Sequence, residues 1–184
     1  MFERMNFQMI GKFRRWLPAV AVLAAIAYFS NQPFAAQDIR PWLVRHIWLM
    51  HRVRELPPVR FTYDEQVMDS RADPAGFVQF WVRKGMHVLL YGLLGLALVT
   101  ALGNAGLKGG SRWLAAAAAL LVVAALDEQH QLVVHGRTGR VLDVLVDLAG
   151  FGFFVVLRST FNVLRSTFRV HNSSFRVRSS RFDR

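Results

Sequence analysis

Residues 127–150 place carboxylates, histidines and arginines between apolar runs of the chain. These side chains could act as general acids and bases, form ion pairs or bind a metal ion. The ligand types present at His87, Glu128, His130 and Asp143 suit a metal, but their spacing matches no HExxH-like motif. We therefore expect no metal and no other cofactor at this position.

A second polar group precedes this stretch. Lys84, His87 and Tyr91 have the spacing i, i+3, i+7, which places them on one face of a helix. Gly95 continues that face and Gly92 lies beside it. Small residues allow another helix to approach closely, so we assign Gly92, Gly95 and Gly150 to helix packing.

The elements that position these residues are apolar blocks. The chain has 184 residues, of which 53% are hydrophobic and 19% charged, and it contains no cysteine. Disulfides and cysteine-based catalysis or zinc binding are thereby excluded. The predicted fold class is all-α: a polytopic membrane protein with four transmembrane helices in a compact bundle. The spans are expected at about 16–30, 82–102, 112–133 and 141–157.

Helix length places the acidic residues within the membrane. Residues 113–126 form an apolar run of 14 residues, about 21 Å of helix at ~1.5 Å per residue. A bilayer core is roughly 30 Å thick, so the helix must continue into the following polar residues. Asp127 and Glu128 are thereby drawn below the membrane surface.

Topology brings the polar residues of three spans to one level. Basic residues in 1–15 place the N-terminus in the cytoplasm, residues 31–81 form an extracytoplasmic loop, and the C-terminus is again cytoplasmic. The expected location is a membrane that bounds the cytoplasm. The candidate site at its outer surface consists of Lys84, His87, Tyr91, Asp127, Glu128, His130, Gln131, Arg137, Asp143 and Asp147.

The chain ends in a basic repeat. Residues 158–184 contain a seven-residue pattern in which Phe161, Phe168, Phe175 and Phe182 recur in register. We predict a disordered low-complexity extension; the alternative is a basic aromatic strip that adheres to the anionic inner leaflet.

Three functions remain open for the polar cluster. It could engage a cell-envelope component, such as a lipid-linked glycan, a peptide precursor or a lipid headgroup. It could belong to a membrane-embedded enzyme that uses acid–base or metal chemistry on a lipid or lipid-linked glycan. It could also be a purely structural polar network in a membrane assembly partner. The absence of a P-loop and of GxGxxG argues against nucleotide use, and the basic residues flank spans rather than indicate nucleic-acid binding.

The ordered motifs resemble the VanZ-like family of small bacterial membrane proteins. They are FSNQP near residue 30, RKGMHVLLYGLLG from Arg83, and DEQHQLVVHGRTGRVLDVLVDLAG from Asp127. The resemblance covers residues 16–157 and implies a four-helix integral membrane protein, located in the bacterial inner membrane. The family's namesake is associated with resistance to the glycopeptide antibiotic teicoplanin. The resemblance assigns no catalytic role to any residue, and we do not infer resistance for this chain.

Overall fold

The computed structural model describes residues 14–134 and 140–179. Their fold is mostly helical, as predicted, with one small β-hairpin. In chain order the elements are α2 (Leu17–Ser30), the 3₁₀ helix η1 (Phe34–Gln37), α3 (Arg40–Arg45), α4 (Ile47–Glu55), β1 (Arg60–Tyr63), β2 (Gln66–Asp69), α5 (Pro74–Asn104), α6 (Ser111–Gln131) and α7 (Val141–Ser179).

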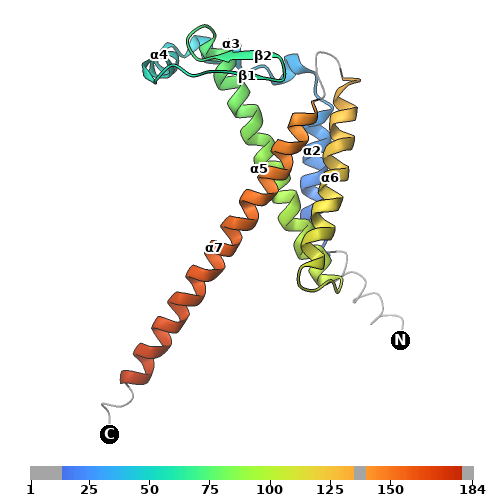
Figure 1. Cartoon of the computed structure of the whole chain (residues 1–184), viewed down its shortest axis with the longest axis vertical. Helices are drawn as coiled ribbons and strands as arrows, with labels where there is room; N and C mark the ends of the chain where they lie inside the picture. Colours follow the sequence, from blue (N-terminus) through green and yellow to red (C-terminus); the bar gives the residue numbers. More distant parts are fainter. Residues whose placement is uncertain (1–13, 135–139, 180–184) are drawn as a thin grey trace.

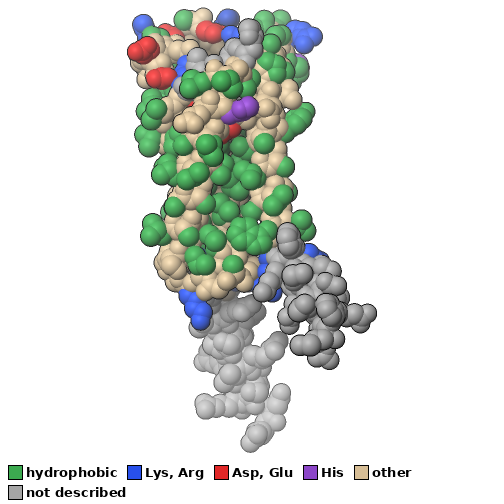
Figure 2. Space-filling view, turned by 90° about the vertical axis from the view of Figure 1, so that its right-hand side faces the viewer, with side chains coloured by type: hydrophobic (Ala, Val, Ile, Leu, Met, Phe, Trp, Pro, Cys, Tyr) green, Lys and Arg blue, Asp and Glu red, His purple; other side chains and the backbone are tan. Residues whose placement is uncertain are grey.

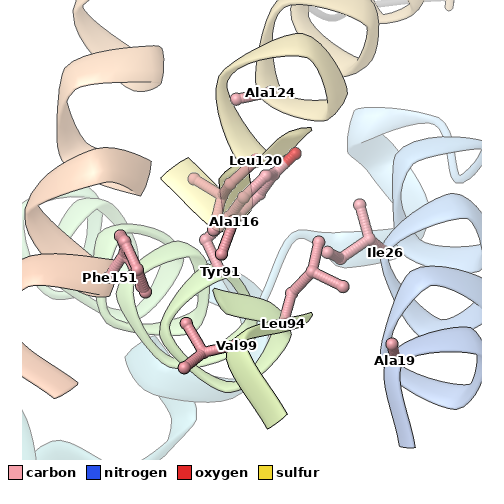
Figure 3. Close-up of a cluster of buried hydrophobic side chains, with 9 residues drawn as sticks. All are labelled: Ala19, Ile26, Tyr91, Leu94, Val99, Ala116, Leu120, Ala124 and Phe151. Atoms are coloured by element: carbon pink, nitrogen blue, oxygen red, sulfur yellow. The ribbon is translucent and has the colours of Figure 1, made fainter. Parts of the chain in front are cut away.

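Helix α5 is the central helix of the fold. It packs against α2, α6 and α7, and α7 crosses it at an angle before running beyond the other helices (Figure 1). Figure 3 shows the core between these four helices, where Leu94 of α5 lies near Ile26 of α2, and Phe151 extends from α7. Leu120 of α6 is completely buried in the same cluster. The core is built from aliphatic and aromatic side chains on facing helices.

Small residues allow α5 and α7 to approach closely. A Cβ atom on Gly150 would lie 2.6 Å from the carbonyl oxygen of Val88, so the two backbones are in direct contact there. Two further glycines of α5 accommodate aromatic rings of α7: Gly92 faces Phe154, and Gly95 faces Phe151. The three glycines assigned to helix packing therefore lie at the crossing of α5 and α7.

The connection between α2 and α5 folds over one end of the helices (Figure 1). Strands β1 and β2 pair antiparallel, with Tyr63 opposite Gln66. The two turn residues, Asp64 and Glu65, have φ angles of 47° and 65°, as a type I′ hairpin turn requires. Within the loop predicted at residues 31–81, Phe61 and Tyr63 alternate with polar residues along β1, and both side chains are half-buried.

Two short helices follow η1 in this connection. Helix α3 ends before His46, and α4 begins directly after it. Leu43 of α3 and Met50 of α4 form a small second core with Ala75 at the start of α5. This part of the connection is anchored on α5 by buried apolar contacts.

Membrane-spanning character is clearest for one helix. Among the described residues, α5 alone is by itself long and apolar enough to cross a bilayer. Helix α2 has only 14 residues, and it would qualify as part of a second span only together with the segment Phe34–Arg45, from which it is bent by 115°. Each of the four predicted spans coincides with a helix, but four membrane crossings remain a prediction.

Helix α7 continues as a helix through Ser179. The backbone of residues 158–179 thus differs from the disordered extension predicted from the repeat. This segment contains neither proline nor glycine, so no residue in it interrupts the helical hydrogen-bond pattern.

Candidate functional site

Buried polar side chains gather at the end of the helices that faces the hairpin. Glu128, Gln131, Asp143 and Asp147 are 6%, 1%, 2% and 0% exposed. Buried charge is costly unless each group has a partner. The contacts of these residues therefore define the site.

Two donor groups from other elements contact the carboxylate of Asp143. Lys84 of α5 forms an ion pair with its Oδ1 atom, and the Tyr63 hydroxyl donates a hydrogen bond of 2.6 Å to the same atom. The Lys84 ammonium also lies 4.4 Å from the centroid of the Tyr63 ring, in a cation–π contact. Burial raises the pKa of the Tyr63 phenol, and the hydrogen bond to Asp143 acts in the same direction. Tyr63 is therefore a protonated donor that ties the hairpin to α7.

Asp147 lies one helical turn further along α7 and faces His87. The distance from His87 Nδ1 to Asp147 Oδ1 is 2.9 Å. The imidazole of His87 also stacks on the ring of Tyr91, with 6.0 Å between the ring centroids. The carboxylate fixes the orientation of the imidazole, as required of a histidine that moves a proton or binds a ligand.

Helix α6 contributes two carboxylates with different partners. Asp127 Oδ2 accepts hydrogen bonds of 3.0 Å from both the Tyr91 hydroxyl and the Gln131 amide. Glu128 Oε2 accepts a 2.6 Å hydrogen bond from the backbone N–H of Arg140. Asp127 is thus satisfied on one oxygen by two donors, whereas Glu128 is held by the backbone at the start of α7.

His87, Glu128 and Asp147 meet between α5, α6 and α7. One potential ligand atom from each lies within 4.8 Å of the others. Of the four possible metal ligands noted in the sequence, His87 and Glu128 belong to this group. Asp143 is engaged by Lys84 instead, and Asp147 takes the third place.

Of the ten predicted members of the site, one lies away from this arrangement and one lies outside the described residues. His130 is exposed, and its Nε2 atom lies 2.9 Å from Asn31 Oδ1 at the end of α2. Arg137 lies outside the described residues. The structure brings the other eight together at one end of the helices: Lys84, His87, Tyr91, Asp127, Glu128, Gln131, Asp143 and Asp147.

Two cavities adjoin the buried cluster. One of about 330 Å³ has apolar walls from Ile26, Val82 and Leu90, and His87, Tyr91, Asp127 and Gln131 also line it. A second, of about 220 Å³, lies under the hairpin and is lined by residues including Lys84, Arg140 and Asp143. Arg83 lines both cavities.

A model of one protein family covers most of the chain. The family described as VanZ/LLP1 matches residues 15–162. The chain belongs to the VanZ-like family. No curated protein and no solved structure matches it. The matched region contains the whole buried cluster, and most of the repetitive tail lies beyond it.

Several residues beside the cluster of this VanZ-like protein were missed by sequence reasoning. Arg83 begins the motif that contains Lys84 and that suggested the family. Its place in that motif was the only indication in the sequence that it lies near the site. Tyr63 gave none, because its role depends on a hairpin that folds back over α5. Gln79 is buried, accepts a hydrogen bond from the Ile39 N–H at 3.0 Å and donates one to the Gln37 carbonyl. It fastens the connection to α5 beside the larger cavity.

Proposed function

We propose that this VanZ-like protein crosses the bacterial inner membrane four times, with both termini in the cytoplasm. Its polar end then faces outward and binds the anionic headgroup of a cell-envelope component, such as a lipid-linked glycan or peptide precursor. The VanZ-like family is linked to glycopeptide resistance, and glycopeptides act on the cell envelope. This common location supports the proposal without assigning resistance to this chain.

The distribution of side chains supports a membrane location. Large apolar residues face outward on the helices: Leu114 and Leu126 of α6 are 75% and 59% exposed, and Val156 of α7 is 64% exposed. The carboxylates at their outer ends are buried instead. Figure 2 shows hydrophobic side chains over the middle of one face, with charged side chains gathered towards the ends. Apolar groups outside and polar groups inside is the arrangement expected in lipid.

The observation that carries the binding proposal is the 330 Å³ cavity and its lining. Its apolar residues suit an acyl or prenyl chain, and its polar residues lie beside the cluster. Arg83 is the cation at this position, and its guanidinium lies 5.7 Å from the Phe34 ring centroid. No carboxylate among the described residues forms an ion pair with it. A guanidinium in such a place suits a phosphate group, which it can contact through two N–H donors.

The test compares Arg83→Gln with Arg54→Gln, a matched change at an exposed arginine of α4. The purified proteins are incubated in detergent with a polyprenyl phosphate, and bound lipid is measured by native mass spectrometry. We expect binding by the wild type and by Arg54→Gln, and at least a tenfold loss for Arg83→Gln, about 1.4 kcal/mol. Equal retention by all three proteins would refute the proposal.

Cellular assays separate this function from a structural one. The same variants are expressed at matched protein levels, and susceptibility to envelope-directed drugs is compared. A binding role predicts a changed susceptibility for Arg83→Gln at normal abundance. A purely structural network predicts reduced abundance without that separate effect.

A further inference from the structure

The group formed by His87, Glu128 and Asp147 joins three helices that are distant in sequence. Each contributes one residue: α5 provides the imidazole, and α6 and α7 provide the carboxylates. Their potential ligand atoms all lie within 4.8 Å of one another. Protein ligands bind zinc at about 2.0–2.2 Å, so two of them lie at most roughly 4.4 Å apart. A small side-chain adjustment suffices to place all three around one ion.

Each carboxylate of this group has one oxygen atom that has no hydrogen-bond partner among the described residues. Glu128 Oε1 and Asp147 Oδ2 are buried and accept no hydrogen bond from the described residues. The residues themselves are 6% and 0% exposed. Buried polar atoms in native proteins are nearly always paired, so these two point to a missing positive ligand.

Two cations beside this group are engaged by other carboxylates. Lys84 is paired with Asp143, and the Arg140 guanidinium lies 3.1 Å from Asp64 of the hairpin turn. Among the described residues, His87 Nδ1 lies 2.9 Å from Asp147 Oδ1, and Glu128 accepts a hydrogen bond from the backbone N–H of Arg140. Two carboxylates this close and this deeply buried require compensation, which a divalent cation supplies in full.

The remaining oxygens of the two carboxylates hold them in orientation. Glu128 Oε2 accepts from the Arg140 N–H, which leaves Oε1 for a ligand. Asp147 Oδ1 faces His87 Nδ1, which leaves Oδ2. Hydrogen bonds of this kind around metal ligands fix their geometry and raise affinity.

We propose that His87, Glu128 and Asp147 bind one divalent transition-metal ion, with zinc as the best match. A nitrogen and two carboxylate oxygens suit zinc, whereas magnesium and calcium favour all-oxygen sites with more ligands. Three protein ligands leave a coordination position for water or for an oxygen atom of a bound molecule. His87 also lines the 330 Å³ cavity, so a molecule in that cavity lies beside the ion.

The site is tested with Zn²⁺ alone on the full-length protein in detergent. After chelator treatment, bound zinc is measured by elemental analysis, and affinity by competition with a chromogenic chelator. Glu128→Gln and Asp147→Asn preserve side-chain size while removing one charged ligand each. His130→Gln, at an exposed histidine two residues from Glu128, controls for adventitious binding by surface histidines.

We expect one zinc ion per chain in the wild type and in His130→Gln. Affinity falls by about 100-fold or more in Glu128→Gln and Asp147→Asn, beyond the effect of changing a supporting group. X-ray absorption at the zinc edge should show nitrogen and oxygen ligands at about 2.0–2.2 Å and, since the chain has no cysteine, no sulfur. Where a variant elutes as an aggregate, His87→Asn replaces it in the comparison.

Two results would overturn the proposal. One is a folded wild type that binds no zinc above the level of the Glu128→Gln protein. The other is zinc binding lost on His130→Gln but retained in both carboxylate variants, which would locate the ion on the surface. The assay contains no envelope component, so its outcome is independent of the function proposed above.

Discussion

Lys84 and Asp143 form an ion pair between α5 and α7, with side chains only 12% and 3% exposed. The pair lies where the hairpin covers the two helices, and the Tyr63 hydroxyl reaches the same carboxylate oxygen. Burial makes each charge dependent on its partner. Together these contacts join the hairpin, α5 and α7 at one carboxylate.

We expect Asp143→Ala to destabilise the protein strongly, by about 3–5 kcal/mol, because the Lys84 ammonium is left buried without a carboxylate. The double variant Lys84→Met/Asp143→Leu should recover much of this loss, since it removes both charges and retains apolar volume. Unfolding by sodium dodecyl sulfate, followed by circular dichroism, measures the free energy. The exposed pair Arg40–Asp38 is the control, and Arg40→Ala should cost no more than about 1 kcal/mol. Equal losses for the two sites would contradict the buried pair's importance.

Tyr63→Phe removes the hydroxyl that donates 2.6 Å to Asp143 while retaining the ring beside Lys84. We expect a loss of about 1 kcal/mol, measured as a fall in the unfolding midpoint. The pKa of Tyr63 is raised above its ordinary value of 10.0, chiefly by burial. A raised pKa means that the contribution is fully present below the unfolded value and is lost only as pH rises above it. The difference between wild type and Tyr63→Phe should therefore stay constant between about pH 6 and 9. A difference that disappears within that range would show that another group accounts for it.

Gly150→Ala tests the close approach of α5 and α7. The added Cβ would meet the Val88 carbonyl oxygen at 2.6 Å, and backbone cannot move aside as a side chain can. We expect destabilisation by about 1–3 kcal/mol, as in overpacked cores. Gly152→Ala is the matched control two residues later on α7, where a new Cβ meets no atom within 4 Å. It should be neutral or stabilising by up to about 1 kcal/mol, because alanine favours helix. Thermal unfolding of both variants measures the two changes in stability.

The sequence predicted the helices well because apolar blocks bounded by glycine, proline and polar turns leave few alternatives. Helix α6 begins and ends within two residues of its predicted span, and the length argument for Asp127 and Glu128 rested on the same block. The side of each helix that is buried was harder to predict. Helix α6 is apolar nearly all round before Asp127, so its sequence has no period that marks the inner face.

His130 was assigned to the site because the sequence of α6 does not mark its buried face. The buried residues of α6 follow one stripe through Ala124, Glu128 and Gln131. His130 precedes Gln131 by one residue, about 100° around a helix of 3.6 residues per turn, and it lies outside. Tyr63 and Arg83 were missed for a different reason. Their contacts depend on how the long connection folds over α5, which no local pattern encodes.

The orientation of the four proposed spans can be tested with single cysteines, because the natural chain contains none. Asp38 lies between η1 and α3 at the hairpin end, and Lys108 lies in the turn between α5 and α6 at the opposite end (Figure 1). In intact cells, a membrane-impermeant maleimide should label Asp38→Cys and leave Lys108→Cys unmodified until the membrane is permeabilised. The reason is that α5 begins at the first end and, at 31 residues, is long enough to cross the bilayer before it reaches the second. Labelling of position 108 from outside would place the buried cluster of Lys84, Asp143 and their neighbours towards the cytoplasm. An outward-facing site for an envelope component would then be excluded, while the zinc site would be unaffected.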